Sequence, residues 1–141
     1  MDIVISYEPG PTPVTVMRII GAINAASYEK LQETAREVIE RGTHDILLDL
    51  AEVPYISSAA FRAIFYMFYA LRTEAPEDSD AAIRNGVKAG TYRSPHLKLA
   101  RPTPRVEEIL KLAGTDQLLE IYDDRQAALA SFQSDRLKLD H

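Results

Sequence analysis

The stretch Asp45-Ile46-Leu47-Leu48-Asp49-Leu50 decides the fold, because three large aliphatic side chains follow one another at its centre. A continuous apolar run of this kind predicts a strand that is buried on both faces of a sheet. Before it, residues 26–41 predict a helix that ends at Gly42, with one apolar face made by Leu31, Ala35, Val38 and Ile39. Residues 14–20 are rich in β-branched side chains and predict another strand. Strand, helix and strand together form a βαβ unit, whose crossover is nearly always right-handed.

The chain on either side continues the alternation of strands and helices. Residues 1–7 alternate as a strand does, and a short proline-rich link to residues 14–20 forces the two to pair antiparallel. Beyond the βαβ unit, we expect a helix from Ser57-Ser58 to about Arg72 and strands at residues 97–100 and 118–122. Thr103 and Pro104 begin a helix that Gly114 closes, and Asp123 with Gln126 predicts the cap of a final helix to about Phe132.

These elements predict a single α/β domain with a mixed central sheet of about 4–5 strands, flanked by about four helices. The domain spans residues 1–133, with a long loop at residues 73–96 and a frayed tail at residues 134–141. Such a loop is either a disordered insertion, which we favour, or an added contact arm for a partner. The sequence leaves the oligomeric state open, since strand edges and helix faces support a dimer or none.

Composition restricts the function. The 141 residues include 16 Lys and Arg against 21 Asp and Glu, a net charge of −5 that argues against nucleic-acid binding and favours a basic partner surface. Cysteine is absent, which excludes disulfides and thiolate metal sites and fits a reducing cytosol. The most apolar segment, residues 59–71, is interrupted by Arg62 and is too short to cross a membrane. We therefore expect a cytoplasmic protein.

Signs of catalysis are few. The sequence has neither of the glycine-rich patterns GxGxxG and GxxxxGK[ST] that hold phosphates, and no nucleophile, base and acid can be assembled from its order. His44, His96 and His141 stand far apart, which predicts surface or edge histidines. Asp49 ends the buried strand, where α/β domains place functional groups, although a structural hydrogen bond explains it equally well. We expect a binding protein with no cofactor and no metal.

The stretch Tyr55-Ile56-Ser57-Ser58-Ala59-Ala60-Phe61 carries the strongest local signal. A serine before an apolar helix is first an N-cap, because its oxygen satisfies an unpaired backbone N–H group. A helix N-terminus also tolerates negative charge, so a phosphoryl group added there need not unfold the domain. It adds about 1.5 to 2 negative charges to a surface that a partner reads. A serine in this place can therefore switch binding.

The order of elements and the local motifs resemble the STAS domain of sulfate transporters and anti-sigma-factor antagonists. A Gly-x-Leu-Asp-like turn of that family is matched by Gly21-Ala22-Ile23-Asn24, and its strand ending in Leu-Asp-Leu by Leu48-Asp49-Leu50. The family stretch Asp-Ser-Ser-Gly-Leu is matched by residues 57–61, and the later helix, strand and helix also fit. The resemblance covers about residues 12–133 and implies an anti-sigma-factor antagonist.

In the family this domain captures an anti-sigma factor, usually a serine kinase with a histidine-kinase-like ATP site, and phosphorylation ends the capture. The resemblance implies that Ser58 is the phospho-acceptor and that the docking surface is formed by Asn24, Tyr55, Ser57, Ser58, Phe61 and Arg62. The chain departs from the family pattern in three places. Ser57 replaces the motif aspartate and is an alternative acceptor, Ala60 replaces the glycine, and Asn24 replaces an aspartate.

Two other functions stay open. The loss of the motif aspartate is compatible with a scaffold or accessory subunit of a transporter or signalling assembly that is never phosphorylated. A nucleotide or small-ligand sensor ranks lower, because the sequence offers no phosphate-binding loop.

Overall fold

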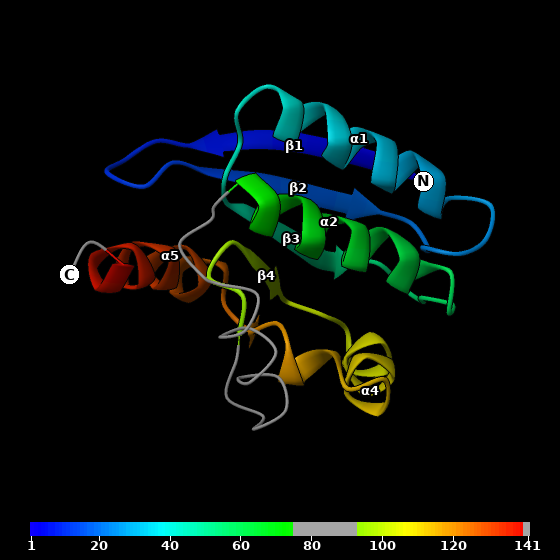
Figure 1. Cartoon of the computed structure of the whole chain (residues 1–141). Coiled ribbons are helices and arrows are strands. Elements are labelled where there is room, and N and C mark those ends of the chain that lie inside the picture. The colour runs from blue at the N-terminus through cyan, green and yellow to red at the C-terminus, as the bar shows by residue number, and fades with distance from the viewer. Residues whose placement is uncertain (75–92, 140–141) are drawn as a thin grey trace.

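The computed structural model describes residues 1–74 and 93–139, and side chains within residues 1–72 and 93–135 (Figure 1). Within these ranges the chain forms five strands, four α-helices and one short 3-10 helix. In chain order they are β1 (Asp2–Glu8), β2 (Val14–Ile20), α1 (Tyr28–Glu40), β3 (Ile46–Glu52), α2 (Ala60–Glu74), β4 (Leu97–Ala100), α4 (Pro104–Leu112), η1 (Thr115–Gln117), β5 (Ile121–Tyr122) and α5 (Arg125–Leu139). The expected α/β domain with a mixed sheet is confirmed.

The five strands form one sheet in the order β1-β2-β3-β4-β5. β1 pairs antiparallel with β2 from Asp2 opposite Ile20 to Glu8 opposite Val14, as the short link between them requires. The other three pairs are parallel, with Arg18 opposite Asp49 and Asp49 opposite Ala100. The carboxyl ends of β2, β3 and β4 therefore meet at one end of the sheet.

Helices cover both faces of the sheet. On one face α1, α2 and α4 pack on a large core that includes Met17, Ile19, Leu48, Leu50, Leu97 and Leu99. On the other face α5 packs Ala128 and Phe132 against Val14, Val16, Leu47 and Ala100. Because β3 contributes to both cores, its aliphatic run is buried on both sides, as the sequence predicts. Figure 1 shows the starts of α1 and α2 at the same end of the molecule, at the right.

The last strand is shorter than the expected residues 118–122. Gly114 takes a left-handed conformation with a φ of 77° and leads into η1. The N–H groups of Leu118 and Leu119 then donate to the carbonyl oxygen of Thr115, at 3.0 Å and 2.9 Å. These residues are therefore held in a turn, the buried Leu119 joins the core, and only Ile121–Tyr122 remains to pair with β4.

The final helix begins and ends later than expected. Its cap is Asp124 rather than Asp123, because the Asp124 carboxylate accepts the N–H groups of Gln126 and Ala127, both at 3.2 Å. The helix continues to Leu139, where a frayed tail from residue 134 was expected.

The reason is Lys98, which is fully buried beneath α5. Its Nζ donates to the Ser131 hydroxyl at 2.8 Å, pairs with Asp135, and lies 3.3 Å from a Glu120 carboxylate oxygen. A buried ammonium needs such partners, so it fixes the part of the helix that supplies them.

The expected loop at residues 73–96 is shorter at both ends. α2 continues to Glu74, and residues 93–96 approach β4 as ordered backbone, with the Ser94 N–H donating to the Leu118 carbonyl oxygen at 2.9 Å. Residues 75–92, which make up the rest of that prediction, lie outside the described residues. The same is true of residues 140–141 of the expected tail.

Candidate docking site

Two segments that follow neighbouring strands lie side by side at the carboxyl end of the sheet. Ile23, after β2, forms an isolated parallel bridge with Ile56, after β3. The Ile23 N–H donates to the Tyr55 carbonyl oxygen at 3.1 Å, and the Ser57 N–H donates to the Ile23 carbonyl oxygen at 2.9 Å. Both isoleucines are buried, so the bridge is fastened to the core. Because the bridge is parallel, Asn24 and Ser57 leave it next to each other.

Asn24 closes the turn that begins α1. Its side-chain oxygen accepts the Ala26 N–H at 2.9 Å and the Ser27 hydroxyl at 3.3 Å. Its backbone carbonyl accepts the Tyr28 N–H at 2.9 Å, while its own N–H donates to the Ser27 hydroxyl at 3.0 Å. The side-chain nitrogen Nδ2 has no hydrogen-bond partner among the described residues. Asn24 therefore holds the turn with its oxygen and keeps an amide donor for another molecule.

Ser57 and Ser58 differ in what their hydroxyls do. Ser57 is half-buried, and its Oγ accepts the Ala59 N–H at 3.3 Å, a weak version of the expected cap. Ser58 is exposed, and its hydroxyl has no hydrogen bond to any residue within the described ranges. The Ser58 backbone carbonyl accepts the Phe61 N–H at 3.2 Å, so its position is fixed although its hydroxyl is not. The capping role therefore falls to Ser57, and the hydroxyl of Ser58 is open to solvent.

Aromatic and cationic side chains surround the two serines. The Phe61 ring is half-buried against the main core, with its centroid 6.2 Å from that of Phe65. The guanidinium of Arg62 is exposed and lies 5.7 Å from the centroid of the Tyr28 ring. Tyr55 is 39% exposed, and the Arg105 guanidinium lies 4.7 Å from its ring centroid.

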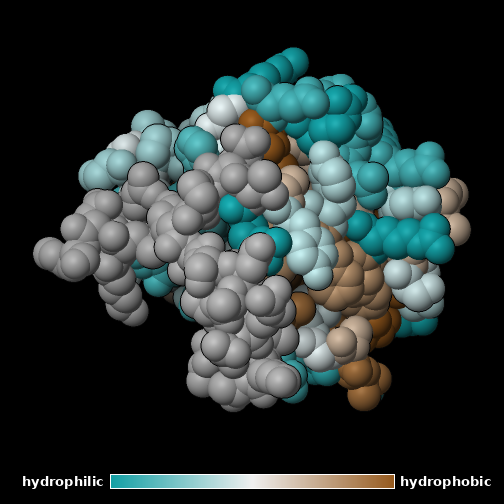
Figure 2. All heavy atoms as spheres, viewed as in Figure 1, coloured by the Kyte–Doolittle hydropathy of each residue, from teal (hydrophilic) through white to brown (hydrophobic). Residues whose placement is uncertain are grey.

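The structure places the residues that the sequence singled out on adjoining segments: Asn24 on one, and Tyr55, Ser57, Ser58, Phe61 and Arg62 on the other. Two neighbours were not predicted from the sequence: Tyr28, whose ring lies beneath Arg62, and Arg105, whose guanidinium lies over Tyr55. Arg105 comes from the first turn of α4, and no motif marks it. In the view of Figure 2, apolar residues gather at the lower right, in the region of α2 and α4, whereas the region of α1 above them is hydrophilic.

Asp49 lies at the same end of the sheet but serves the fold. It is fully buried, one of its oxygens accepts the Ala51 N–H at 3.1 Å, and the other lies 2.5 Å from Nη2 of Arg101. The hydrogen bond that Arg101 donates to Asp49 raises the pKa of Arg101 and keeps that guanidinium charged. Arg101 also has a positive φ of 55°, a conformation that non-glycine residues rarely adopt. Of the two explanations left open for Asp49, its contacts favour the structural one.

One histidine is buried, where surface or edge histidines were expected. The Nδ1 of His96 lies 2.8 Å from a carboxylate oxygen of Asp45, and both residues are buried at the other end of the sheet. His44 is exposed, and His141 lies outside the described residues. No three metal-ligating side chains come together within the described ranges.

None of the helices in the described ranges has the length and apolarity needed to cross a membrane.

Comparisons with known proteins agree with the fold and the sequence motifs. The sequence profile of the STAS domain matches residues 8–75, which include both segments of the site. A protein of Bordetella bronchiseptica named anti-sigma factor antagonist BtrV is 25% identical over 114 residues, 81% of this chain and 82% of that protein.

Two solved structures show the fold more fully. An anti-sigma-factor antagonist (STAS) domain protein from Planctomyces limnophilus superposes with a TM-score of 0.71 at 16% identity, over 94% of this chain and 99% of that one. The phosphorylated form of the Bacillus cell fate determinant SpoIIAA superposes with a TM-score of 0.56 at 12% identity, over 90% and 97% of the two chains.

Proposed function

Since residues 8–75 of this chain belong to the STAS domain family, we propose that the protein is an anti-sigma-factor antagonist. It binds an anti-sigma factor reversibly and is not an enzyme. Phosphorylation of Ser58 by that partner, a serine kinase with a histidine-kinase-like fold, ends the binding. The partner's ATP supplies the phosphoryl group: the Ser58 hydroxyl loses its proton and forms the new O–P bond, and ADP leaves. We expect this exchange to take place in the cytoplasm.

The observation that carries the proposal is the hydroxyl of Ser58 just before α2, which is exposed and has no hydrogen bond to any residue that the structure describes. The positive end of the helix dipole stabilises a phosphate at this point, so modification leaves the fold intact. The Ile23–Ile56 bridge places Asn24 beside the serines, and the side-chain nitrogen of Asn24 is a donor for a partner. Phosphorylation would thus place about two negative charges within the docking surface.

Ser57 is the weaker candidate for phosphorylation, because its hydroxyl oxygen already accepts a hydrogen bond from the Ala59 N–H and its side chain is half-buried. The names of two similar proteins add support of another kind. BtrV is named as an anti-sigma factor antagonist, and SpoIIAA has been solved in a phosphorylated form.

The test is intact-mass spectrometry after co-expression with anti-sigma factors of the serine-kinase type encoded in the same genome. We expect one added phosphate on the parent and on Ser57→Ala, and none on Ser58→Ala. Ser58→Ala should still bind the anti-sigma factor, whereas the phosphorylated parent should not. A phosphate that persists in Ser58→Ala and disappears in Ser57→Ala would move the switch to Ser57.

The replacement of the motif aspartate by Ser57 supports a second candidate, a scaffold or accessory subunit that binds its partner without being phosphorylated. In that case the parent forms a stable complex and keeps its unmodified mass. The same co-expression experiment therefore separates the two candidates.

A further inference from the structure

Two arginines near Ser58 are held by aromatic rings instead of carboxylates. The Arg62 guanidinium lies over Tyr28, 5.7 Å from the ring centroid, and the Arg105 guanidinium lies over Tyr55, 4.7 Å from the ring centroid. Both side chains are exposed, and neither forms an ion pair with any residue that the structure describes. A guanidinium stacked on a ring keeps its edge N–H donors free, and these donors match a carboxylate or a phosphate bidentately.

The two arginines come from different elements on either side of the segment that carries Ser58. Arg62 is four residues after Ser58, and helical side chains lean toward the N-terminus of their helix, so its guanidinium leans toward the start of α2. The ring beneath this guanidinium belongs to Tyr28, the first residue of α1, whose backbone N–H donates to the Asn24 carbonyl oxygen.

Arg105 approaches from α4. Thr103, the N-cap of that helix, places its hydroxyl 3.5 Å from the Val53 carbonyl oxygen and so keeps the start of α4 beside the segment that carries Tyr55 and Ser58. The two tyrosine rings, of Tyr28 and Tyr55, therefore belong to the two segments that the Ile23–Ile56 bridge joins.

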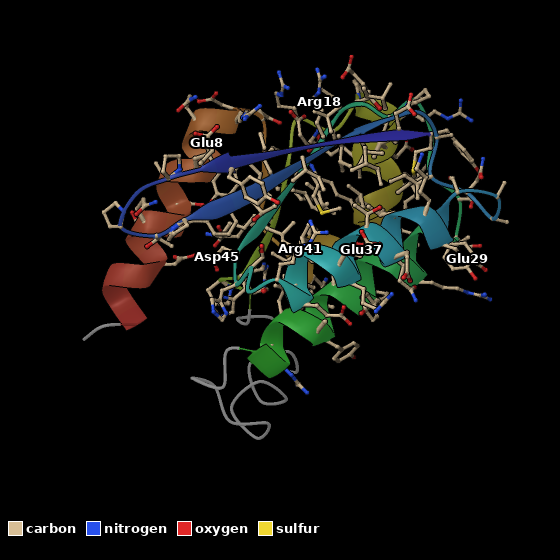
Figure 3. All side chains as sticks on the ribbon, turned by 90° about the horizontal axis from the view of Figure 1, so that it is seen from above. Glu8, Arg18, Glu29, Glu37, Arg41 and Asp45 are labelled. Carbon is tan, nitrogen blue, oxygen red and sulfur yellow. The ribbon has the colours of Figure 1, made fainter. Side chains whose placement is uncertain are left out.

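Three carboxylates on the neighbouring elements have partners of their own, whereas Glu108, on the same helix as Arg105, forms no ion pair among the described residues. Glu52 pairs with Arg18 at 3.2 Å, Glu107 pairs with Lys111 at 3.0 Å, and Glu29 accepts the Tyr28 hydroxyl at 3.2 Å. Figure 3 shows Glu29 at the start of α1, and Arg18 on the side of the sheet away from α1. Positions 24 and 57, which carry aspartates in the family pattern, hold Asn24 and Ser57. Although the whole chain has a net charge of −5, Arg62 and Arg105 present two positive charges here that no carboxylate among the described residues pairs.

We propose that Arg62 and Arg105 bind an acidic segment of the anti-sigma factor, and that a phosphate on Ser58 displaces this segment by binding the same guanidiniums. The inference rests on the proposed function and adds the chemistry of the partner and the means of its release. It differs from the basic partner surface expected from net charge, because two guanidiniums without carboxylate partners favour an acidic ligand at this point. Displacement needs no change of fold, since both ligands compete for the same donors.

Binding of the Ser58 phosphate by the two arginines is tested without a kinase. The full chain is prepared with phosphoserine at position 58 by genetic code expansion. We expect ³¹P NMR titration to give a second phosphate pKa below the value of about 6 of free phosphoserine. In the double variant Arg62→Gln/Arg105→Gln this pKa should rise toward the free value. Arg36→Gln, whose side chain is bound by Glu33 and Glu40, is the matched control and should titrate like the parent. Equal titration curves for the parent and the double variant would overturn this binding.

Binding of the acidic segment is tested by calorimetry in a Ser58→Ala background, with the anti-sigma factor that the co-expression experiment identifies. We expect Arg62→Gln/Arg105→Gln to weaken binding at least tenfold and to reduce the dependence of affinity on salt, because the lost contacts are charged. An unchanged affinity in the double variant would refute the acidic segment. If Ser58→Ala with both arginines intact does not bind at all, the proposed function is refuted. The ³¹P titration would still decide whether the arginines hold the phosphate.

The double variant must fold for either result to count. Both arginines are exposed, so its thermal unfolding should match that of the parent closely. If it does not, Arg62→Lys/Arg105→Lys keeps both charges and loses only the planar donors. That variant should bind more weakly than the parent but keep the salt dependence.

Discussion

The basic side chains of this protein occupy two contrasting surroundings. At the carboxyl end of the sheet, Arg62 and Arg105 are exposed, rest on tyrosine rings and have no carboxylate partner within the described residues. Beneath α5, Lys98 is fully buried and has Asp135, Glu120 and Ser131 around its ammonium group. The Phe132 ring centroid lies 4.8 Å from the same nitrogen.

The difference shows that a positive charge stabilises the fold where it is buried and paired, and can bind a partner where it is exposed and unpaired. A buried ammonium is costly without compensation, so everything that compensates Lys98 is tied to its place. An exposed guanidinium on a ring is held without being neutralised, and its donors stay free. Changes beneath α5 should therefore affect stability, and changes around Ser58 should affect binding.

The largest expected effect comes from breaking the charged group beneath α5. Lys98→Ala leaves Asp135 and Glu120 without their cation and opens a cavity against Phe132, so we expect a loss of about 3 kcal/mol of unfolding free energy. Urea denaturation measures it. Lys98→Met fills the space and should lose clearly less. A loss below about 1 kcal/mol for Lys98→Ala would show that the cluster does not hold α5.

The second expected effect is a loss of stability at alkaline pH. It concerns Tyr122, whose ring lies beside Lys98. Burial, and then the hydrogen bond to Glu120, raise the pKa of Tyr122 from 10.0 to about 12. Between these pH values the unfolded chain has lost the hydroxyl proton that the folded chain keeps, so stability falls as the pH rises from about 10 to 12. A shift of two pKa units corresponds to about 2.7 kcal/mol. Because Tyr122 is only partly buried, solvent screening reduces the expected loss to about 1.5 kcal/mol, and Tyr122→Phe should remove it. Parallel denaturation curves for parent and variant across this range would contradict it.

At the other end of the sheet, Ser57→Ala should cost about 0.5 to 1 kcal/mol, because the Ala59 N–H loses the side-chain oxygen that accepts it. Thermal unfolding measures this change. Ser57→Asn, another good capping residue, is the control and should recover most of the loss. If Ser57→Ala were neutral, the capping role would not be supported.

The smallest effect sharpens the contrast between the two serines. Ser58→Ala removes an exposed hydroxyl that has no hydrogen bond within the described ranges, so its stability should stay within about 0.5 kcal/mol of the parent. The comparison is made under the same conditions as for Ser57→Ala. A large loss in Ser58→Ala would mean that Ser58 serves the fold, and it would confuse any reading of its binding.

The sequence predicts the fold well where the pattern is local. The strands Val14–Ile20 and Leu97–Ala100 have the bounds that their β-branched and apolar residues predict. The short β5 was not foreseeable, because the turn before it depends on hydrogen bonds to Thr115 and on Leu119 reaching the core. Lys98 was missed for a related reason: on sequence alone a lysine in a strand indicates an exposed face.

The candidate site was predicted unevenly. Ser57 and Ser58 follow from the chemistry of a helix start, whereas Asn24 and the rest of the docking surface follow from family resemblance. Arg105 follows from neither, because only the three-dimensional fold brings the first turn of α4 to Tyr55. Contacts between distant segments are set by packing, and a single sequence does not display them.

The bridge between Ile23 and Ile56 also provides a built-in reporter. The amide hydrogens of Ile23 and Ser57 are held by its two hydrogen bonds, so they exchange with deuterated water only when the bridge opens. Their exchange rates thus record how often the two segments separate, on a timescale that a static picture does not contain. If a bound partner spans both segments, these two amides should slow together, and phosphate on Ser58 should return them to the rates of the unbound chain.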